Sequence, residues 1–357
     1  MLVSKNRGVQ AVFLLHLPTF AGVFAKALPF NATLFFMNNP AAKVNPILAH
    51  WKQQFPPLAQ IPWAGVFTTC YFAWFYGVVG LRPEHTAIYF LLVGLYTIHE
   101  KTRHFLFAFA IFLLYVVVFD SLRMFPNYLY NTVHIEDLYN ADKSLFGINY
   151  GTQRLTLNEY AQLYRNPIAD VLSGVFYVSW VPVPLLFATY LFFNNKTLCL
   201  RFLYGFVFTT FIGVAIYYLY PAAPPWYVEE HGFRLLLNTR TNPAGLLNFD
   251  EITGIPLFKS IYSNGPMPFA AMPSKHAAFP LFCFLYGRKL QKNWLNAAFL
   301  ICTAGIWFSA IYTQHHYVLD VLAGGLLAVT GYLLFERIMK TNVGQRCFNR
   351  LLKQIGG

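Results

Sequence analysis

The sequence contains few charged residues. Only 11% of its 357 residues are Asp, Glu, Lys or Arg, whereas about 25% of an ordinary soluble domain is charged. Hydrophobic residues account for 57% of the chain and aromatic residues for 19%. This composition excludes a water-soluble globule and an intrinsically disordered chain, and it indicates a membrane protein.

Acidic residues are scarcer than basic ones, with 14 against 26, and the formal net charge is +12. A basic surplus can indicate nucleic-acid binding, which requires Lys and Arg along a stripe that follows the phosphates. Here the basic residues are scattered between apolar runs. We therefore expect no nucleic-acid partner.

Cysteine is also rare and follows no pattern. The five cysteines stand singly, mostly inside or beside apolar runs, and form no C-x-x-C pair: Cys70, Cys199, Cys283, Cys302 and Cys347. This spacing excludes a disulfide scaffold and a cysteine-based zinc site. We expect buried core thiols.

Long apolar runs are abundant, by contrast. A spanning helix needs about 20 mostly apolar residues, because ~30 Å of hydrocarbon is crossed at 1.5 Å per residue. The sequence predicts an all-α polytopic bundle of about eight transmembrane helices, near residues 61–81, 84–99, 104–120, 171–194, 200–220, 270–287, 295–313 and 316–336. Residues 61–357 form the expected membrane-embedded domain, and residues 1–60 a cytoplasmic or interfacial segment.

The distribution of charge predicts the orientation. With eight helices and cytoplasmic termini, the cytoplasmic segments hold 17 of the 26 basic residues and only two of the 14 acidic ones, in agreement with the positive-inside rule. The long polar loops 121–170 and 221–269 then both lie on the exoplasmic side. Loops of this length in a compact bundle are usually functional.

Residues 1–36 allow two interpretations. Lys5 and Arg7 precede an apolar stretch, as in a secretory leader. Cleavage would place the new terminus outside, against the charge distribution, and Pro18 and Pro29 interrupt the apolar run. We expect an uncleaved helix that lies in the membrane interface.

Two short motifs carry the chemistry. His316 and Asp320 have i, i+4 spacing, so a helix places both on one face, where the carboxylate can accept the imidazole N–H and orient the ring. His276 opens another predicted span whose first residue lies on the same side of the membrane. Ionisable groups at membrane depth are costly and indicate function, so these three residues are the candidate catalytic group.

Other interpretations of this group remain open. His316, Asp320 and His276 could hold zinc, although no fourth ligand is evident, and we expect neither a metal nor a cofactor. The same groups could serve as the proton relay of a transporter or channel. His315 is interpreted as a neighbour of the catalytic group.

Pro273-Ser274-Lys275-His276 and His316-x-x-x-Asp320 resemble the last two signatures of the type 2 phosphatidic acid phosphatase superfamily. Within it, the chain is most similar to the branch that contains inositol phosphorylceramide synthase. Further similarity follows in the same order across residues 110–336: Asp120 to Arg123, Val133 to Tyr139, Tyr220 to Tyr227, Ser263-Asn264-Gly265 and His315 to Tyr317.

This resemblance implies a six-helix phosphotransferase core and a specific mechanism. His316 would attack the phosphorus of a lipid phosphate ester to form a phosphohistidine, Asp320 would orient it, and His276 would protonate the leaving alcohol. An acceptor hydroxyl or water would then take the phosphoryl group.

The chain departs from the superfamily in its phosphate-binding cations. Tyr220 opens the segment that replaces the first signature, and Ala310 stands where an Arg is expected. Fewer cations favour a monoanionic phosphodiester over a dianionic monoester. The resemblance thus implies transfer of a phosphoalcohol, phosphoinositol above all, from a glycerophospholipid to ceramide or a similar lipid, with a lipid phosphate phosphatase as the alternative.

The residues that would bind the substrate are a separate prediction. Ser274, Lys275 and the turn at Asn264 are candidate phosphate ligands, although Lys275 could instead be an interfacial charge. Arg123 could bind phosphate or form an ion pair with Asp120. Tyr220 is a further candidate for substrate binding. Trp226 either belongs to the aromatic belt or contacts the acceptor. The expected location is a bacterial inner membrane, with a Golgi membrane as the alternative.

Overall fold

The chain divides into two units, Met1–Gln53 and Gln54–Gly357. The structure, a computed structural model, describes residues of the second unit: Pro56 and residues 61–237, 239–263, 265 and 267–356. The predicted interfacial helix or leader within residues 1–36 therefore lies outside the described residues.

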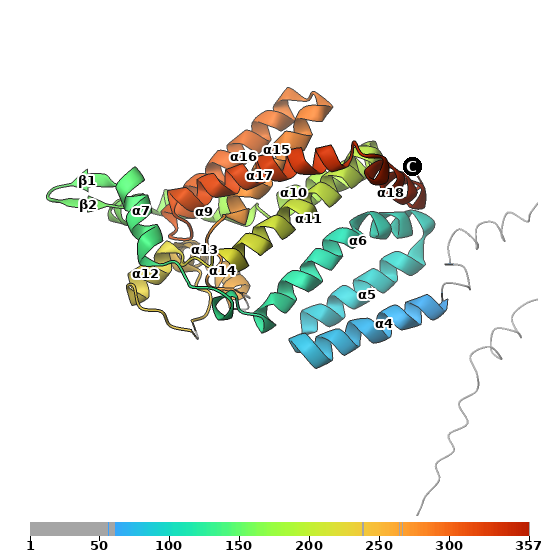
Figure 1. Ribbon diagram of the computed structural model, residues 1–357, viewed down its shortest axis with the longest axis horizontal. Helices are drawn as coiled ribbons and strands as arrows, with labels where there is room; N and C mark the ends of the chain where they lie inside the picture. The colour runs from blue at the N-terminus through green and yellow to red at the C-terminus, as the bar shows by residue number, and fades with distance from the viewer. Residues whose placement is uncertain (1–55, 57–60, 238, 264, 266, 357) are drawn as a thin grey trace, which may run out of the picture. The chain divides into compact units, whose positions relative to one another are not determined.

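The second unit is built almost entirely of helices, and each of the eight predicted spans coincides with a helix or a helix pair (Figure 1). These are α4 (Ile61–Trp74, continued by the π-helix Phe75–Val79), α5 (Pro83–Ile98), α6 (Glu100–Ser121), α9 (Pro167–Val178) with α10 (Pro182–Asn194), α11 (Lys196–Leu219), α15 (Lys275–Gly287), α16 (Asn293–Tyr312) and α17 (Val318–Ile338). The prediction of a polytopic helical membrane protein is confirmed.

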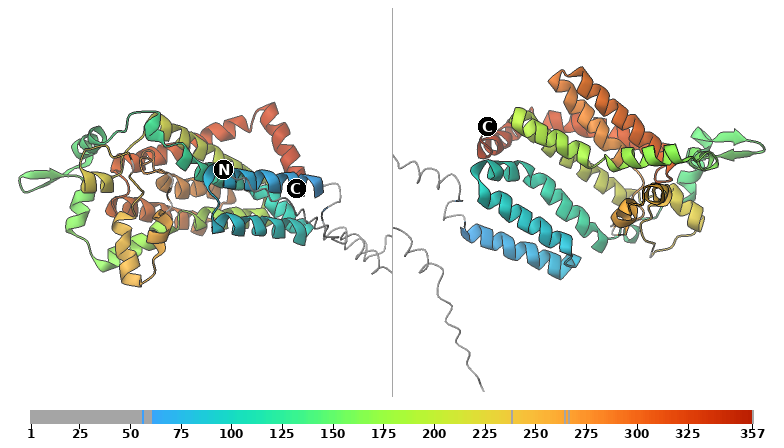
Figure 2. Two further views of the ribbon diagram at one scale, coloured as in Figure 1. Left: turned by 90° about the horizontal axis from the view of Figure 1, so that it is seen from below. Right: turned by 180° about the vertical axis from the view of Figure 1, so that it is seen from behind.

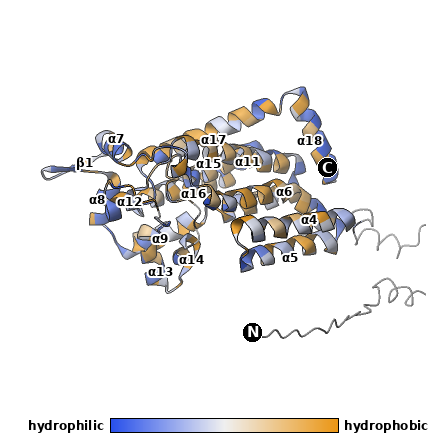
Figure 3. Cartoon of the chain, turned by 60° about the horizontal axis from the view of Figure 1, so that its bottom comes forward, coloured by the Kyte–Doolittle hydropathy of each residue, from blue (hydrophilic) through white to orange (hydrophobic). Residues whose placement is uncertain are grey.

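The helices differ in length. By length and composition, α6, α11, α16 and α17 can each cross a membrane alone, and α9 with α10 can do so as one span bent by 42°. Pro182 and Pro184 follow this bend, where a missing N–H interrupts the hydrogen bonds of a continuous helix. Figure 3 shows hydrophobic residues along the long helices.

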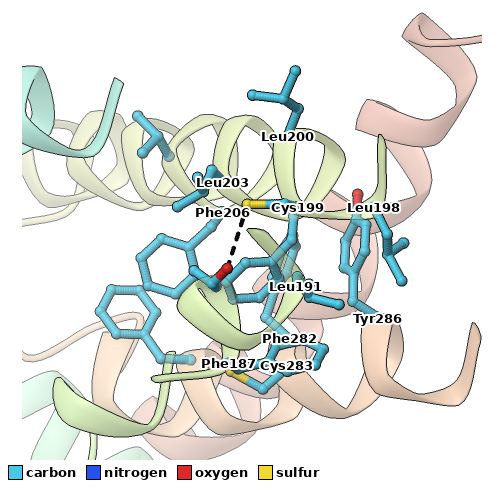
Figure 4. Packing of buried hydrophobic residues seen from close by; sticks show 14 of the residues in the cluster. Phe187, Leu191, Leu198, Cys199, Leu200, Leu203, Phe206, Phe282, Cys283 and Tyr286 are labelled. Atoms are coloured by element: carbon cyan, nitrogen blue, oxygen red, sulfur yellow. Dashed lines mark hydrogen bonds between the residues drawn. The ribbon is translucent and has the colours of Figure 1, made fainter. Parts of the chain in front are cut away.

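The main core lies where α15 packs against α10, α11, α16 and α17. Figure 4 shows part of it, including Phe187, Phe206, Phe282 and Cys199, whose thiol donates to the Ala188 carbonyl. Because lipid is as apolar as these side chains, association between the helices depends on close packing. A Cβ on Gly324 of α17 would lie 2.2 Å from the Ser274 carbonyl oxygen, so only glycine permits this approach.

The prediction that the cysteines are buried core thiols is only partly correct. Cys199 and Cys283 are buried, but Cys70 and Cys347 are exposed. Cys70 lies on α4 and lines an apolar cavity between α4, α5 and α6. Cys347 lies on α18 (Asn342–Gln354), a helix that the sequence analysis did not predict.

Both long loops lie at one end of the bundle. The first forms α7 (Glu136–Phe146), the hairpin β1 (Ile148–Tyr150) with β2 (Gln153–Leu155), and α8 (Leu157–Leu163); the second forms α12 (Pro225–His231), α13 (Leu247–Thr253) and α14 (Leu257–Tyr262). In the hairpin Ile148 pairs with Leu155. Bridges from Ala222 to His134 and Ala270 join the loops, while α18 lies at the opposite end (Figure 2).

Candidate active site

The start of α15 is fixed against the start of α17. Ser274 is the N-cap of α15, and its hydroxyl accepts a hydrogen bond from the Ala277 N–H at 3.2 Å. Such a cap satisfies an amide at the helix end that has no carbonyl partner within the helix. The Ser274 N–H in turn donates to the Asp320 carbonyl at 2.9 Å. These contacts place His276, the second residue of α15, beside the residues of α17.

The turn between α16 and α17 presents two histidines. The His315 and His316 N–H groups both lie 3.0 Å from the Ala310 carbonyl. Gln314 has φ 68°, a left-handed conformation that costs a non-glycine residue about 1–2 kcal/mol. The surrounding loop compensates this cost, because the Asn158 amide donates to the Ile311 and His316 carbonyls at 2.8 and 2.9 Å.

The three predicted catalytic residues come together here. His276 Nδ1 lies 3.0 Å from His316 Nε2, and His316 Nδ1 lies 3.6 Å from Asp320 Oδ2. Asp320 is fully buried and also accepts the Tyr317 N–H at 2.9 Å. His316 thus lies between a carboxylate near one ring nitrogen and His276 at the other, so a candidate nucleophile, its orienting carboxylate and a candidate acid are brought together.

Two tyrosines extend this chain of polar contacts. The Tyr177 hydroxyl lies 3.1 Å from His276 Nδ1, and the Tyr262 hydroxyl donates to Tyr177 at 3.4 Å. Tyr177 is buried in α9. Neither residue was predicted from the sequence, because a tyrosine in an aromatic-rich chain gives no signal until its partner is known.

His315 packs beside this chain of contacts. Its ring stacks on Tyr262 with centroids 4.9 Å apart and an interplanar angle of 25°. Burial, together with the neighbouring His316, holds the pKa of His315 well below its usual range. A neutral, stacked ring fits the predicted role of a neighbour.

Lys275 points away from the histidines. Its ammonium lies 3.7 Å from the centroid of the Phe119 ring and 4.9 Å from that of Tyr217, toward α6 and α11. Among the described residues, Nζ has no hydrogen-bond partner, although the side chain is buried. The rings stabilise the cation through their faces, but they supply no counter-charge.

Asp120 and Arg123 form the ion pair that was one of their two predicted roles, and they have further partners. Arg82 Nη2 lies 2.8 Å from both Asp120 oxygens, and Arg123 Nη2 lies 2.5 Å from Oδ1. His85 Nε2 lies 3.1 Å from Asp120 Oδ2. This group, which we call the α5–α6 charge cluster (Arg82, His85, Asp120 and Arg123), joins the start of α5 to the end of α6.

The two aromatic candidates, Tyr220 and Trp226, pack within the folded loops. Tyr220 stacks on His134 with centroids 3.7 Å apart and an angle of 9°. Trp226 is only 5% exposed, and its backbone N–H donates to the Gln314 backbone carbonyl at 3.0 Å. The interpretation of Trp226 as a belt aromatic is therefore wrong, because the folded loop covers its ring. Asn264 lies outside the described residues.

Asp142 of α7 is a further residue that the sequence analysis missed. Its carboxylate Oδ1 accepts the Leu319 N–H at 3.0 Å, so it caps the helix that carries Asp320. Burial raises the pKa of Asp142 to about 6, and the nearby Asp320 adds to the rise while backbone N–H donors oppose it. Among the described residues, no three His, Cys, Asp or Glu side chains are arranged to hold a metal ion.

Comparison with known proteins places these residues in a family. The profile of the PAP2 superfamily matches residues 155–334, which include His276, His316 and Asp320. The chain belongs to the PAP2 superfamily. This confirms the resemblance seen in the sequence, and no solved structure is significantly similar to the chain.

Relatives in this superfamily include lipid-modifying synthases. The chain is 41% identical over 280 residues to phosphoinositol dihydroceramide synthase of Bacteroides thetaiotaomicron, covering 78% of this chain and 92% of that protein. It is 28% identical over 205 residues to inositol phosphorylceramide synthase of Candida albicans, covering 53% of this chain and 42% of that protein. It is 25% identical over 267 residues to the inositol phosphorylceramide synthase catalytic subunit of Saccharomyces cerevisiae, covering 72% of this chain and 62% of that protein.

Proposed function

We propose that this protein transfers phosphoinositol from a glycerophospholipid to ceramide or dihydroceramide and releases diacylglycerol. The contact of His276 with His316, backed by Asp320, is the observation that carries the chemistry. The 41% identity to a phosphoinositol dihydroceramide synthase, along nearly the whole of that protein, supports the choice of headgroup and acceptor.

In the first half-reaction, His316 Nε2 attacks the phosphorus of the phosphodiester. The bond from phosphorus to the diacylglycerol oxygen breaks, and that oxygen takes a proton from His276. Asp320 stabilises the positive charge that develops on the His316 ring, because its carboxylate faces Nδ1. The product is diacylglycerol and a phosphoinositol group bound to His316.

In the second half-reaction, the ceramide hydroxyl attacks the same phosphorus. His276, now neutral, accepts the hydroxyl proton, and the bond from His316 to phosphorus breaks. Both histidines return to their starting protonation states, so the cycle needs no external acid or base.

In the proposed mechanism, substrate must separate the two rings. A reacting phosphorus stands ~3–3.5 Å from its nucleophile before attack, and the leaving oxygen must lie within hydrogen-bond reach of its acid. The 3.0 Å between His276 Nδ1 and His316 Nε2 leaves no room for either atom. Binding of the phosphodiester therefore moves His276 away from His316, and the contact to Tyr177 guides that movement.

Lys275 remains our candidate for the residue that neutralises the negative charge of the bound phosphate. A buried cation without a counter-charge is unfavourable, and an incoming phosphate would relieve that cost. Its ammonium faces Phe119 and Tyr217 at rest, so binding of phosphate requires a change of rotamer. We propose that Ser274 acts by capping α15, and that Tyr220 and Trp226 act by stabilising the loops that hold Gln314 and His134.

Trapping of the covalent intermediate tests this mechanism. With phosphatidylinositol labelled in the inositol ring and no acceptor, the wild-type protein should retain label, and His316→Ala should retain none. His104→Ala, on α6 at the end far from the site, is the control and should behave as wild type. Label that persists on His316→Ala would remove the nucleophile assignment.

A second variant separates the acid from the nucleophile. His276→Ala should be inactive with natural lipid but should still form the labelled intermediate from a nitrophenyl ester of phosphoinositol, because a good leaving group needs no proton. Loss of labelling with both substrates would show that His276 does not act as the acid. Chelators should leave the wild-type rate unchanged, and strong inhibition would support a metal mechanism.

A further inference from the structure

A large apolar cavity lies beside the candidate active site. It has a volume of about 1170 Å³ and is lined on one side by α4, α5 and α6 and on the other by residues that include Trp180, Phe206 and Phe279. Pockets for drug-sized ligands typically measure ~300–1,000 Å³. The cavity is therefore large enough for a long aliphatic chain.

Aromatic side chains that line this cavity also contact the candidate catalytic residues. The Trp180 ring lies 4.9 Å from the His276 ring and 5.6 Å from Phe279, between centroids. On the α6 side, Phe119 lines the cavity and also carries the Lys275 ammonium on its face. His276 and Lys275, at the start of α15, therefore each contact an aromatic side chain that lines the cavity.

The charged lining residues are confined to one part of the cavity. Arg82, Glu84 and His85 at the start of α5 and Asp120 at the end of α6 belong to the wall, and most of the remaining lining is apolar. Arg82 Nη1 is buried without a hydrogen-bond partner among the described residues, so it can donate to an oxygen of a bound molecule. A cavity with one polar end and an apolar body matches an amphipathic lipid.

We propose that this cavity holds an aliphatic chain of a lipid substrate. A polar group of that lipid contacts the α5–α6 charge cluster, and its phosphate or hydroxyl points toward Trp180 and His276. The proposal rests on the transferase function above. The far wall comes from α4, α5 and α6, which precede the residues matched by the superfamily profile. These helices would then adapt the catalytic core to long-chain lipids. An acyl chain of the donor and a chain of the ceramide share this chemistry.

Filling the cavity tests the proposal and distinguishes the two lipids. Ala110 of α6 lines the cavity, and Ala87 of α5 is exposed but does not line it. Ala110→Trp should raise KM for the occupying lipid at least tenfold, because each methylene group denied burial lowers affinity roughly fourfold. The value of kcat at saturation, and KM for short-chain analogues, should stay near wild type. Ala87→Trp is the matched control and should change neither.

Each lipid is varied in chain length while the other is kept saturating. A rise in KM confined to the donor assigns the cavity to an acyl chain of the glycerophospholipid, and a rise confined to the acceptor assigns it to ceramide. An unchanged KM for both lipids in Ala110→Trp, or an equal rise in Ala87→Trp, would overturn the proposal.

Photo-crosslinking gives a measurement that does not depend on turnover. Phosphatidylinositol or ceramide with a diazirine near the chain end should label α4, α5 or α6 in the wild-type protein, and Ala110→Trp should lose most of that label. If labelling occurs but no transfer is found with any lipid pair, the cavity assignment stands and the proposed function fails. Label found only outside these helices would overturn the cavity assignment.

Discussion

The candidate catalytic residues contact side chains that lie far away in the sequence. His276 contacts Tyr177, which is 99 positions away in the chain, and the His316 carbonyl is held by Asn158, 158 positions away. The sequence motifs brought forward the three candidate catalytic residues, which the structure places together, because each motif combines a residue type with a short spacing. They could not identify Tyr177, Asn158 or Asp142, because those roles exist only after the loops have folded over the helices.

Removal of the Tyr177 hydroxyl should affect only the step that His276 assists. Tyr177→Phe keeps the ring but removes the hydrogen bond to His276, so kcat with natural lipid should fall about fivefold to tenfold, as expected for loss of ~1 kcal/mol. With a nitrophenyl leaving group, the rate of intermediate formation should be unchanged. Stopped-flow kinetics with both substrates measure this difference.

Tyr286→Phe is the matched control for this variant. Tyr286 is equally buried, but its hydroxyl donates to Glu336 at the far end of α15. Tyr286→Phe should leave unchanged both the rate with natural lipid and the rate with the nitrophenyl leaving group. An equal loss with both leaving groups in Tyr177→Phe would show a structural role instead of positioning of the acid.

Asp142 should make stability depend on pH. The pKa of its carboxyl is raised to about 6 in the folded protein from 3.8, so the folded state binds this proton more tightly. The stabilisation is present below pH 4 and is lost as pH rises through about 6, and the change amounts to ~3 kcal/mol. Asp142→Asn keeps an oxygen acceptor for the Leu319 N–H but has no carboxyl to titrate. Its stability should therefore not show the loss that the Asp142 carboxyl causes as pH rises from 4 to about 6. Unfolding midpoints in detergent between pH 4 and 7 test this, and identical slopes for both proteins would contradict it.

At the scale of elements, apolar run length predicted the helices well. A helix or helix pair lies at each of the eight predicted positions. Among the described residues, four helices, or five spans with the bent pair α9 and α10, are long and apolar enough to cross a membrane, where a helix satisfies its own backbone. The short helices of the loops and α18 were not predicted. Their backbone is satisfied partly by contacts far along the chain, such as the Lys196 ammonium donating to the Ile355 carbonyl at 2.9 Å.

The close crossing of α15 and α17 should be sensitive to a single methyl group. Gly324→Ala places a Cβ 2.2 Å from the backbone oxygen of Ser274, which cannot move without displacing the start of α15. We expect a loss of about 1–3 kcal/mol in stability and a large loss of activity. Gly94→Ala on α5, where the nearest atom is a side-chain carbon at 3.9 Å, should be neutral. Thermal unfolding in detergent compares them, and a neutral Gly324→Ala would contradict the packing argument.

At the scale of the whole molecule, the two long loops lie at the same end of the bundle, as the predicted alternation of spans requires. Loops 121–170 and 221–269 gather at the end that holds the histidines. The side of the membrane on which that end lies remains our proposal, together with cytoplasmic termini and a bacterial membrane. The bacterial relative supports the last of these.

Cysteine labelling determines the orientation. Cys347 of α18 is exposed at the end opposite the site, and Thr152 lies exposed at the turn of the β1–β2 hairpin. In intact cells, a membrane-impermeant maleimide should label Thr152→Cys in a Cys347→Ser background and should leave Cys347 of the wild type unlabelled. Cys347→Ser alone is the control for background labelling. Labelling of Cys347 without permeabilisation would reverse the proposed topology.

The most direct test of the central claim is mass spectrometry of the products that purified protein makes in detergent from phosphatidylinositol and ceramide. Transfer predicts a phosphoinositol-bearing ceramide and an equal amount of diacylglycerol, both absent with His316→Ala. Diacylglycerol accompanied by free inositol phosphate, or release of inorganic phosphate from a lipid monoester, with no modified ceramide, would show a hydrolase and contradict the proposed transfer.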